Sequence, residues 1–350
     1  MSDTNILLSI IITCFNYDRY IATAIDSALS QKMSNVEIIV VDDGSCDNSW
    51  SVITSYGSAI TAIKIENQGQ MQSSLRGFLS ASGAFIYFLD GDDYLKNESL
   101  SQILGLLTGN ISKVQFMLTP VDQFGDKIGH PFPDLKTSTE TSSLIRSINL
   151  RGYYSSPPTS GNIFHRSVFD HVFSNTKRLN YERGIDGVAL LLAPFIGNVL
   201  SLDRPLAYYR VHSANQSAFS VLTSSRMDGY RNRFIARIDH LDEILNSIKI
   251  DRIGFSQTSS YSYAREMQIL SRIISHSRPS YTEILLYRKS ISKEFSQLRS
   301  IVMLVFVLFI LISPRKFALD MIEFRINQGK YSRVRSLLKK IALLLGGRSI

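Results

Sequence analysis

Cysteine is scarce in this sequence: the 350 residues include two, Cys14 and Cys46. Two cysteines cannot build the disulfide framework that stabilises many small secreted proteins. The polar start, Met1-Ser2-Asp3-Thr4-Asn5, also lacks the basic and apolar regions of a secretory signal peptide. We therefore expect a protein of the reducing cytoplasm.

Two common nucleotide-binding motifs are also missing. The sequence has no glycine-rich Walker loop followed by Lys-Ser or Lys-Thr, and no Gly-X-Gly-X-X-Gly follows its first apolar run. These absences disfavour kinase and dehydrogenase functions. With 44% hydrophobic and 19% charged residues, the composition is typical of a globular chain, and its length suggests one catalytic domain with an appendage.

Positive charge is concentrated at the carboxyl end. Residues 315–350 contain nine Lys or Arg against two acidic residues, so this segment carries most of the formal net charge of +8. The rest of the chain is close to neutral. This distribution argues against a nucleic-acid-binding body and favours a basic tail that meets an anionic surface.

Short apolar runs alternate with amphipathic stretches over the first hundred residues, which predicts an α/β fold with a mostly parallel sheet flanked by helices. Later segments predict further strands, a helix and a long helical region. The expected strands are 7–12, 36–41, 60–65, 84–89, 113–121, 199–202 and 206–211, and the expected helical segments are 21–29, 70–82, 184–195 and 221–298.

Acidic residues directly follow two of these runs. Asp90-Gly91-Asp92-Asp93 comes after the run 84–89. Two carboxylates one residue apart can share a divalent cation, although a plain turn also explains the cluster. Asp42-Asp43-Gly44-Ser45 follows the run 36–41. This second pair can shape a helix-capping turn with Ser45, Asp47 or Ser49, or accept hydrogen bonds from a uracil imide or a ribose hydroxyl.

Four segments together carry a resemblance to a known family. They are Ser9-Ile10-Ile11-Ile12-Thr13-Cys14-Phe15-Asn16, Val40-Val41-Asp42-Asp43-Gly44-Ser45, Asn67-Gln68-Gly69-Gln70 and Phe88-Leu89-Asp90-Gly91-Asp92-Asp93. In order, spacing and position at strand ends, they resemble the family 2 glycosyltransferases, which have the Rossmann-like GT-A fold. A weaker resemblance continues through Pro157-Pro158-Thr159-Ser160-Gly161-Asn162, Asp186 and Tyr209-Arg210-Val211-His212 to about residue 217.

The resemblance implies an inverting enzyme that moves a sugar from a nucleoside diphosphate, with UDP favoured, to a hydroxyl of a saccharide or lipid-linked acceptor in the synthesis of cell-surface polysaccharide. It implies that Thr13, Phe15 and Asn16 line the base and ribose pocket, with Asp43 holding the base. By the same resemblance Asn67 and Gln70 contact the donor, Asp90 lies near ribose or metal, Asp92 binds Mg²⁺ or Mn²⁺, and Arg210 and His212 lie near the diphosphate. Ser73-Ser74-Leu75 departs from the Ala-Arg-Asn of many members.

Inversion in one displacement requires a general base, for which Asp186 is the candidate. In the family the corresponding aspartate often follows a glutamate, whereas Ile185 occupies that position here. Glu182 is an alternative base, and a helix-capping role for Asp186 is another reading. Ser160, Gly161 and Asn162 occupy the part of the family pattern that shapes the acceptor side, where glycine would permit close approach of a sugar; an ordinary turn explains them as well.

The end of the chain suggests an association with membranes. Ile301–Ile312 is an apolar run of twelve residues, and as a helix it would span roughly 18 Å, too short for a hydrocarbon core of about 30 Å. It fits a core or partner helix. The apolar residues Val334, Leu337, Leu338, Ile341, Leu344 and Leu345 then alternate with basic ones at helical spacing, which favours in-plane binding to anionic lipid at the cytoplasmic face.

We therefore expect three segments: a catalytic domain at 1–220, a helical extension at 221–300 and an apolar and basic tail at 301–350. Two other functions use the same features. A nucleotidyl- or phosphoryl-transferring enzyme could use the acidic clusters on a nucleotide, and a non-catalytic module could bind a sugar nucleotide at the membrane.

Overall fold

The computed structural model describes residues 6–174, 184–212, 222–251 and 261–326. The chain divides into two compact units, one formed by 1–212 with 237–253 and the other by 213–236 with 254–350. Helix α7 (Ser224–Ser247) therefore contributes residues to both units. The segment boundaries at residues 220 and 300 stay a prediction.

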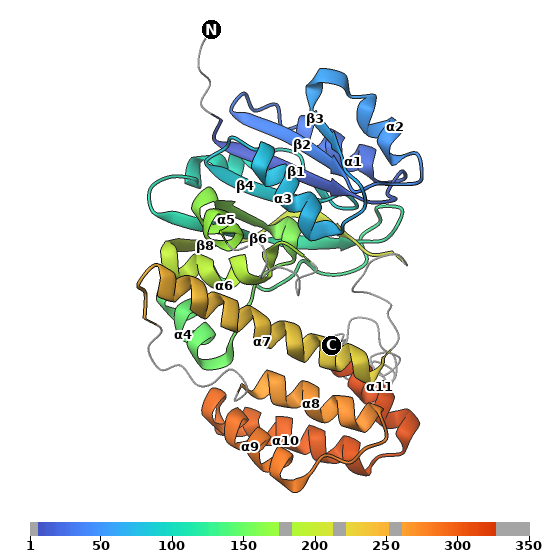
Figure 1. Cartoon of the computed structure of the whole chain (residues 1–350), viewed down its shortest axis with the longest axis vertical. Helices are drawn as coiled ribbons and strands as arrows, with labels where there is room; N and C mark the ends of the chain where they lie inside the picture. Colours follow the sequence, from blue (N-terminus) through green and yellow to red (C-terminus); the bar gives the residue numbers. More distant parts are fainter. Residues whose placement is uncertain (1–5, 175–183, 213–221, 252–260, 327–350) are drawn as a thin grey trace, which may run out of the picture. The chain divides into compact units, whose positions relative to one another are not determined.

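The first unit contains an eight-stranded sheet in the order β3-β2-β1-β4-β7-β6-β8-β5 (Figure 1). Strand β1 (Leu8–Cys14) pairs in parallel with β2 (Val36–Asp42) and with β4 (Phe85–Asp90), and β2 pairs in parallel with the edge strand β3 (Thr61–Lys64). Every residue of β1 is buried. Its continuous apolar run is what a strand covered on both faces of a parallel sheet requires.

The other half of the sheet has mixed directions. Strand β7 (Asn162–His165) lies antiparallel between β4 and β6 (Ile111–Val121). Strand β8 (Asn198–Arg210) pairs in parallel with β6 and antiparallel with β5 (Tyr94–Leu95). The two late strands expected from the sequence are thus one strand, whose register against β6 shifts where Phe116 pairs with Leu202 and Met117 with Pro205. The predicted α/β fold with a mostly parallel sheet is confirmed.

Helices flank this sheet (Figure 1). Helix α3 (Gln70–Ser80) packs closely on β1 because Gly77 has no side chain. A Cβ at Gly77 would lie 2.4 Å from the Cγ2 of Ile11. The helices of this unit besides α7 are α1 (Ile21–Leu29), α2 (Ser49–Thr54), α3 (Gln70–Ser80), α4 (Thr141–Arg151), α5 (Arg166–Phe173) and α6 (Asp186–Ile196). Short 3-10 turns lie at Gly57–Ala59, Leu100–Gln102, Leu104–Leu106 and Thr159–Gly161.

The second unit is helical where it is described. Its helices are α8 (Ser262–Ile274), α9 (Tyr281–Glu294), α10 (Gln297–Ile312) and α11 (Arg315–Ile326), together with the first part of α7. Ser280 and Glu283 form a capping box that starts α9. Buried apolar residues of α8 to α11 make its core. In the described part of the chain, every helix is too short or too polar to cross a bilayer.

One lysine lies inside the first unit. Lys113, on β6, is fully buried, and its ammonium donates hydrogen bonds to Gln115 Oε1 at 2.8 Å, Tyr154 Oη at 3.1 Å and Ser156 Oγ at 2.8 Å. These three partners are neutral. Because burial disfavours the charged form, the pKa of Lys113 lies well below its usual range.

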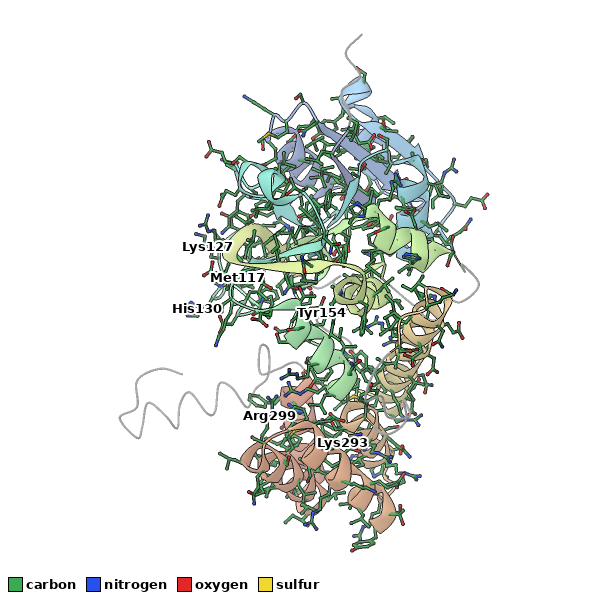
Figure 2. The ribbon with its side chains drawn as sticks, turned by 90° about the vertical axis from the view of Figure 1, so that its left-hand side faces the viewer. Met117, Lys127, His130, Tyr154, Lys293 and Arg299 are labelled. Carbon is green, nitrogen blue, oxygen red and sulfur yellow. The ribbon has the colours of Figure 1, made fainter. Side chains whose placement is uncertain are left out.

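Two of the partners of Lys113, Tyr154 and Ser156, come from a segment that is distant in sequence. The Tyr154 hydroxyl also donates to the Leu190 carbonyl of α6 at 2.8 Å, and Figure 2 labels Tyr154 in this region. Ser156 Oγ donates to Asn162 Oδ1, at the start of β7, at 3.1 Å. Lys113 thereby ties the segment 154–162 to β6 and, through Tyr154, to α6.

Replacing Lys113 with Met is expected to lower the free energy of unfolding by about 1–3 kcal/mol near neutral pH, because Gln115 Oε1 loses its donor inside the core. The loss should grow as the pH rises. Since the pKa of Lys113 is lower in the folded state, the unfolded chain binds more protons between that pKa and about 10.4, and wild-type stability rises with pH over this window. Methionine does not titrate, so the stability of the variant lacks this rise with pH.

Urea unfolding at several pH values between about 6 and 9 measures both effects. Lys136→Met is the matched control, because Lys136 is exposed; its stability should stay within about 0.5 kcal/mol of the wild type. Equal losses in the two variants, or a deficit for Lys113→Met that shrinks as the pH rises, would contradict the prediction.

Candidate active site

The carboxyl ends of β1, β2 and β4 meet at one edge of the sheet (Figure 1). Thr13 lies in register with Val41 on one side and with Asp90 on the other, and Cys14 lies beside Asp42. Because β1 lies between β2 and β4, the loop after β1 starts about 4.8 Å from the loop after each neighbouring strand. In open α/β sheets, ligands bind outside the carboxyl ends of the strands, so this edge is the candidate site.

The loop after β2 is joined to the loop after β3. Asp43, which is buried, accepts hydrogen bonds from the backbone N–H groups of Gln68 and Gly69, each at 2.9 Å. Gly44 has φ +70°, and a Cβ there would lie 2.8 Å from Asn67 N. Both features hold the Asn67 turn against β2. Asp43 binds this turn, and its contact with a base stays a prediction.

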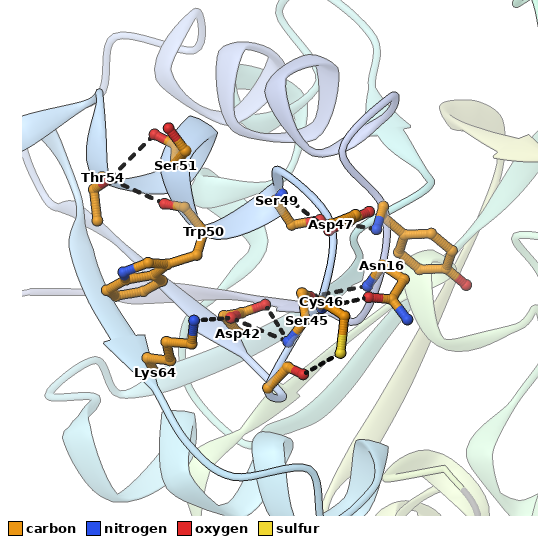
Figure 3. A network of polar contacts seen from close by, with 12 residues as sticks. Asn16, Asp42, Ser45, Cys46, Asp47, Ser49, Trp50, Ser51, Thr54 and Lys64 are labelled. Atoms are coloured by element: carbon orange, nitrogen blue, oxygen red, sulfur yellow. Dashed lines mark hydrogen bonds and ion pairs between the residues drawn. The ribbon is translucent and has the colours of Figure 1, made fainter.

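The loop after β1 is fastened to the same region (Figure 3). The backbone N–H of Asn16 donates to Ser45 Oγ at 2.9 Å, and Asn16 Oδ1 accepts from Cys46 N at 2.8 Å. Asn16 has φ 55°, in the left-handed region that asparagine tolerates better than most residues. The adjacent Phe15 is 42% exposed, so its ring is available at the edge for contact with a planar base.

Asp42 and Asp47 support the loop between β2 and α2 (Figure 3). The carboxylate of Asp42 is fully buried, accepts from Ser45 N at 3.3 to 3.4 Å and lies 3.9 Å from Lys64 Nζ. Asp47 Oδ1 accepts from Ser49 N, at the start of α2, at 2.9 Å. Both side chains hold the backbone of the loop in shape, whereas the cap position of α2 is occupied by Asn48 and not by Ser45, Asp47 or Ser49, so the expected capping residue is wrong.

Asp90 lies at the centre of an acidic cluster. Its Oδ1 accepts a hydrogen bond from Gln70 Nε2 at 2.7 Å. Burial raises the pKa of Asp90 well above its usual range, and the negative charges of Asp92 and Asp186 raise it further. The structure thus brings together Gln70 from the start of α3, Asp90 and Asp92 from the end of β4 and the loop after it, and Asp186 from the start of α6.

His212 is placed against Asp92. Its Nε2 lies 3.0 Å from Asp92 Oδ2, and both side chains are buried. Tyr17 also hydrogen-bonds to Asp92, and burial with the neighbouring aspartates raises the pKa of Tyr17. The rings of Tyr17 and Tyr20 lie 5.9 and 4.9 Å from the His212 ring. The aromatic shell orients the imidazole toward the carboxylate.

Arg210 connects the acidic loop to the end of β6. Its Nε donates to the Asp92 carbonyl at 2.9 Å, and its Nη1 donates to the carbonyls of Asp122 and Gln123 at 3.3 and 3.1 Å. The guanidinium also lies over the rings of Tyr20 and Tyr94, at 4.7 and 5.1 Å. Only 5% of Arg210 is exposed. In this structure its donors bind protein carbonyls, and its contact with a diphosphate stays a prediction.

The backbone of Arg210 reaches the same cluster. Its N–H donates to Asp93 Oδ1 at 2.8 Å. Asp93 is 1% exposed, and burial together with Asp92 and Asp90 raises its pKa well above the usual range. The end of β8 and the acidic loop are therefore fixed to each other by both the main chain and the side chain of one residue.

The three residues expected at the acceptor side are buried. Ser160 Oγ accepts from Asp90 N at 3.2 Å, and Asn162 Nδ2 donates to the carbonyls of Pro157 and Pro158 at 3.1 and 2.8 Å. A Cβ at Gly161 would lie 2.5 Å from the Cβ of Pro157. The space beside this glycine is therefore filled by proline. These residues support the acidic loop from behind, and contact with an acceptor stays a prediction.

Asp186 is the first residue of α6, and the cap position before it is Ile185. Asp186 is therefore not the residue that caps this helix, and the capping alternative is wrong. Asp186 is partly exposed. A Cβ added to Gly184 would lie 3.3 Å from Asp186 Oδ1 and 3.7 Å from Gln70 Oε1, so the side chains of Asp186 and Gln70 both lie beside Gly184. Glu182, the alternative base, lies outside the described residues.

The donor atoms at this edge fit a hard divalent cation that binds together with a diphosphate. Asp90 and Asp92 offer carboxylate oxygens, and His212 offers a nitrogen beside Asp92. Within the described ranges, no three His, Cys, Asp or Glu side chains form a ready metal cluster. Mg²⁺ is commonly held by one or two carboxylates, with substrate phosphates completing its shell, so these residues are compatible with such a site, and metal binding stays a prediction.

Sequence reasoning missed several residues of this region. Tyr17 and Tyr20 lie between the first apolar run and the first helix, where a contact with His212 leaves no sequence pattern. Lys113 lies in an expected strand, but its burial was not expected. A lysine within an apolar run is the sequence signal that could have indicated it. Both contacts depend on segments more than forty residues apart.

The comparisons with known proteins agree with this geometry. The family model for glycosyl transferase family 2 matches residues 9–173. An uncharacterised glycosyltransferase of Nostoc sp. is 31% identical over 286 residues, which cover 76% of this chain and 88% of the Nostoc protein. The minor teichoic acid biosynthesis protein GgaA of Bacillus subtilis is 33% identical over 132 residues, 35% of this chain and 29% of GgaA.

A solved structure supports the fold over most of the chain. The crystal structure of S. aureus TarS 1-349 in complex with UDP-GlcNAc has a TM-score of 0.54 and 16% sequence identity, and the match covers 93% of each chain. At this identity the likeness concerns the fold. The extensive match to the Nostoc protein and the match to the family model together show that this chain belongs to the family 2 glycosyltransferases.

Proposed function

We propose that this glycosyltransferase moves a sugar, with inversion at the anomeric carbon, from a nucleoside diphosphate sugar to a hydroxyl of a saccharide or lipid-linked acceptor. The observation that carries the proposal is the gathering of Asp90, Asp92 and Asp186 at the sheet edge beside the exposed ring of Phe15. Base recognition, leaving-group stabilisation and proton removal each have a side chain there.

The donor would bind with its base and ribose against the loops after β1 and β2. Phe15 offers a ring face, Asn16 and Asp43 lie on these loops, and Thr13 lies at the end of β1. Asn67 and Gln70 border this side from the loop after β3 and the start of α3. UDP is the favoured carrier, because the family resemblance points to it and TarS, which shares the fold, was crystallised with UDP-GlcNAc.

The diphosphate would lie over the acidic loop. Asp92, with Asp90 or His212, would hold Mg²⁺ or Mn²⁺, and the bound cation would neutralise charge that grows on the leaving diphosphate. Arg210 holds the loop through its contacts with the Asp92 carbonyl and the Asp93 carboxyl. The loop is thus preorganised before the donor arrives, which reduces the cost of ordering it during the reaction.

Asp186 would act as the general base. In a single displacement the acceptor oxygen attacks the anomeric carbon, the bond from that carbon to the diphosphate oxygen breaks, and the base takes the acceptor proton. The side-chain amide of Gln70 donates a hydrogen bond to one oxygen of Asp90, and Asp90 interacts electrostatically with Asp186. Asp186 is partly exposed, and because the Gln70 amide binds Asp90, Asp186 would be the carboxylate that meets the acceptor.

The acceptor and the location follow from other features. The name of GgaA supports a role in cell-surface polysaccharide, and the segment 157–162, which includes Ser160, Gly161 and Asn162, would shape the acceptor side from behind the acidic loop. The basic tail supports a peripheral position at the cytoplasmic face of the membrane, where a lipid-linked acceptor would be presented.

Calorimetric titration of UDP, GDP and dTDP, each with and without Mn²⁺, tests the donor site. We expect one nucleotide to bind in a metal-dependent way, and Asp92→Ala to weaken that binding by at least about tenfold, or about 1.4 kcal/mol. Asp134→Ala, which removes an exposed carboxylate, should bind as the wild type does. Failure of all three nucleotides to bind in either condition contradicts the donor site.

Replacing Asp186 with Asn should reduce kcat by about 10²- to 10⁴-fold, because the amide cannot accept the acceptor proton. The affinity for the nucleotide should change by less than about threefold, since it is expected to depend on other residues. Asp203→Asn, at an exposed position of β8, is the control. A variant with the wild-type rate would exclude Asp186 as the base, and a product with retained configuration would exclude inversion.

A further inference from the structure

Helix α10 has two apolar faces, and one of them is uncovered. Ser300, Val307 and Ile310 are buried against the rest of the second unit. On the other side the apolar residues recur at spacings of three and four, which places them on one face of the helix. This exposed face, called here the α10 stripe, consists of Leu298, Ile301, Val302, Val305, Leu308, Phe309 and Ile312, which are 42% to 84% exposed.

The stripe continues onto a neighbouring helix. Phe317, at the start of α11, is 37% exposed, and its ring packs edge-on against the ring of Phe309 with the centroids 5.8 Å apart. Scattered single apolar residues on a surface are normal, whereas a contiguous set of this kind marks a contact site.

The exposed charges in the segment that contains the stripe, residues 281–317, have one sign, and the exposed acidic residue Glu323 lies farther along α11. Between residues 281 and 317, all of which the structure describes, the exposed charged side chains are Arg288, Lys289, Lys293, Arg299, Arg315 and Lys316; Figure 2 labels Lys293 and Arg299. The two acidic residues of this segment are engaged elsewhere. Glu283 binds Arg272 and caps α9, and Glu294 is buried and accepts hydrogen bonds from Ser262.

We propose that the α10 stripe is the surface by which this enzyme lies on an anionic lipid membrane, with its apolar side chains among the acyl chains and the surrounding Lys and Arg at the headgroups. An apolar face bordered by basic residues is the pattern of an interfacial helix. The inference rests on the proposed membrane association and assigns it to a surface.

The helix is suited to lie in the plane of the membrane. Its 16 residues correspond to about 24 Å at about 1.5 Å per residue, which is less than a hydrocarbon core of about 30 Å. Its buried face is also occupied by the core of the unit, with Val307 and Ile310 packed in two apolar clusters. Only the outer face is available, so partial insertion is the geometry that the helix permits.

Charge argues against a second copy of the chain as the occupant. A two-fold dimer would bring the same patch together from both copies and place the basic border of one against that of the other. Such like-charge contacts disfavour association. An anionic bilayer instead offers both an apolar interior and a negative surface.

Sedimentation of the full-length chain with lipid vesicles tests the proposal. The vesicles contain phosphatidylcholine alone or phosphatidylcholine with phosphatidylglycerol. We expect binding to the anionic vesicles that weakens at high salt, and a fall of at least about tenfold in the partition coefficient for the double variant Val302→Gln with Val305→Gln. Glutamine keeps helix propensity high, and circular dichroism checks the fold. Leu79→Gln, at an apolar position of α3 that is 66% exposed, should bind as the wild type does.

A second full-length variant locates the binding surface. Leu337→Gln with Ile341→Gln changes the amphipathic pattern of the tail. The proposal is overturned if the stripe variant binds like the wild type, whether or not the tail variant loses binding. It is also overturned if the wild type does not bind anionic vesicles, or if it forms a dimer in solution that the stripe variant abolishes.

Nucleotide titration on the same proteins separates this inference from the proposed reaction. The stripe variant should bind nucleotide and Mn²⁺ as the wild type does, because α10 contributes no donor residue. Loss of vesicle binding with intact nucleotide binding supports the membrane surface, and vesicle binding without nucleotide binding would leave this surface standing while refuting the donor site.

Discussion

The parallel pairing of β1 with both β2 and β4 determines where the acidic side chains of this enzyme can lie. The register sets Asp42 beside Cys14 and Asp90 beside Thr13, so two carboxylate-bearing loops must leave the sheet at one edge. Asp186 joins them from α6. The fold thus concentrates like charges in a partly buried place, which costs free energy and raises the pKa of Asp90 and Asp93. A concentration of carboxylates of this kind favours the binding of a cation.

The protein offsets this crowding with neutral hydrogen bonds and with a few cations. Gln70 binds Asp90, and the backbone N–H groups of residues 68 and 69 bind Asp43. Arg210 holds the loop backbone through its hydrogen bond to the Asp92 carbonyl. None of these contacts requires a ligand, so the geometry of the edge belongs to the folded chain itself.

The central strands of the first half of the sheet were predictable because they are largely apolar runs bounded by polar loops, as in Leu8–Cys14 and Phe85–Asp90. The acidic loops could be placed for the same reason. Strand β7 has four residues and no period long enough to detect. Strand β8 was divided in two at Asp203 and Arg204, where the pairing with β6 shifts. The partners of Lys113 and Arg210 depend on tertiary contacts that leave no local signal.

The apolar run of α10 is a second case in which the sequence does not determine the tertiary contacts. A run of twelve apolar residues fits a core helix or a surface that binds a partner, and in the structure one face of the helix is buried while apolar residues of the other face are exposed. Which residues are covered depends on the packing of α8, α9 and α11, and that packing involves residues such as Met267, Tyr287 and Ile322 that are far away in the sequence. Hydrophobicity along the chain contains no information on this choice.

The two cysteines of the chain differ in a way that is useful for spectroscopy. Cys14 ends the central strand, and burial raises the pKa of its thiol to about 11, so it stays protonated and inaccessible at neutral pH. Cys46 is exposed in the loop that Asn16 holds beside the candidate donor pocket. A maleimide dye added to the native enzyme therefore attaches at one position, next to the candidate site, and its fluorescence can report loop movement without any engineered cysteine.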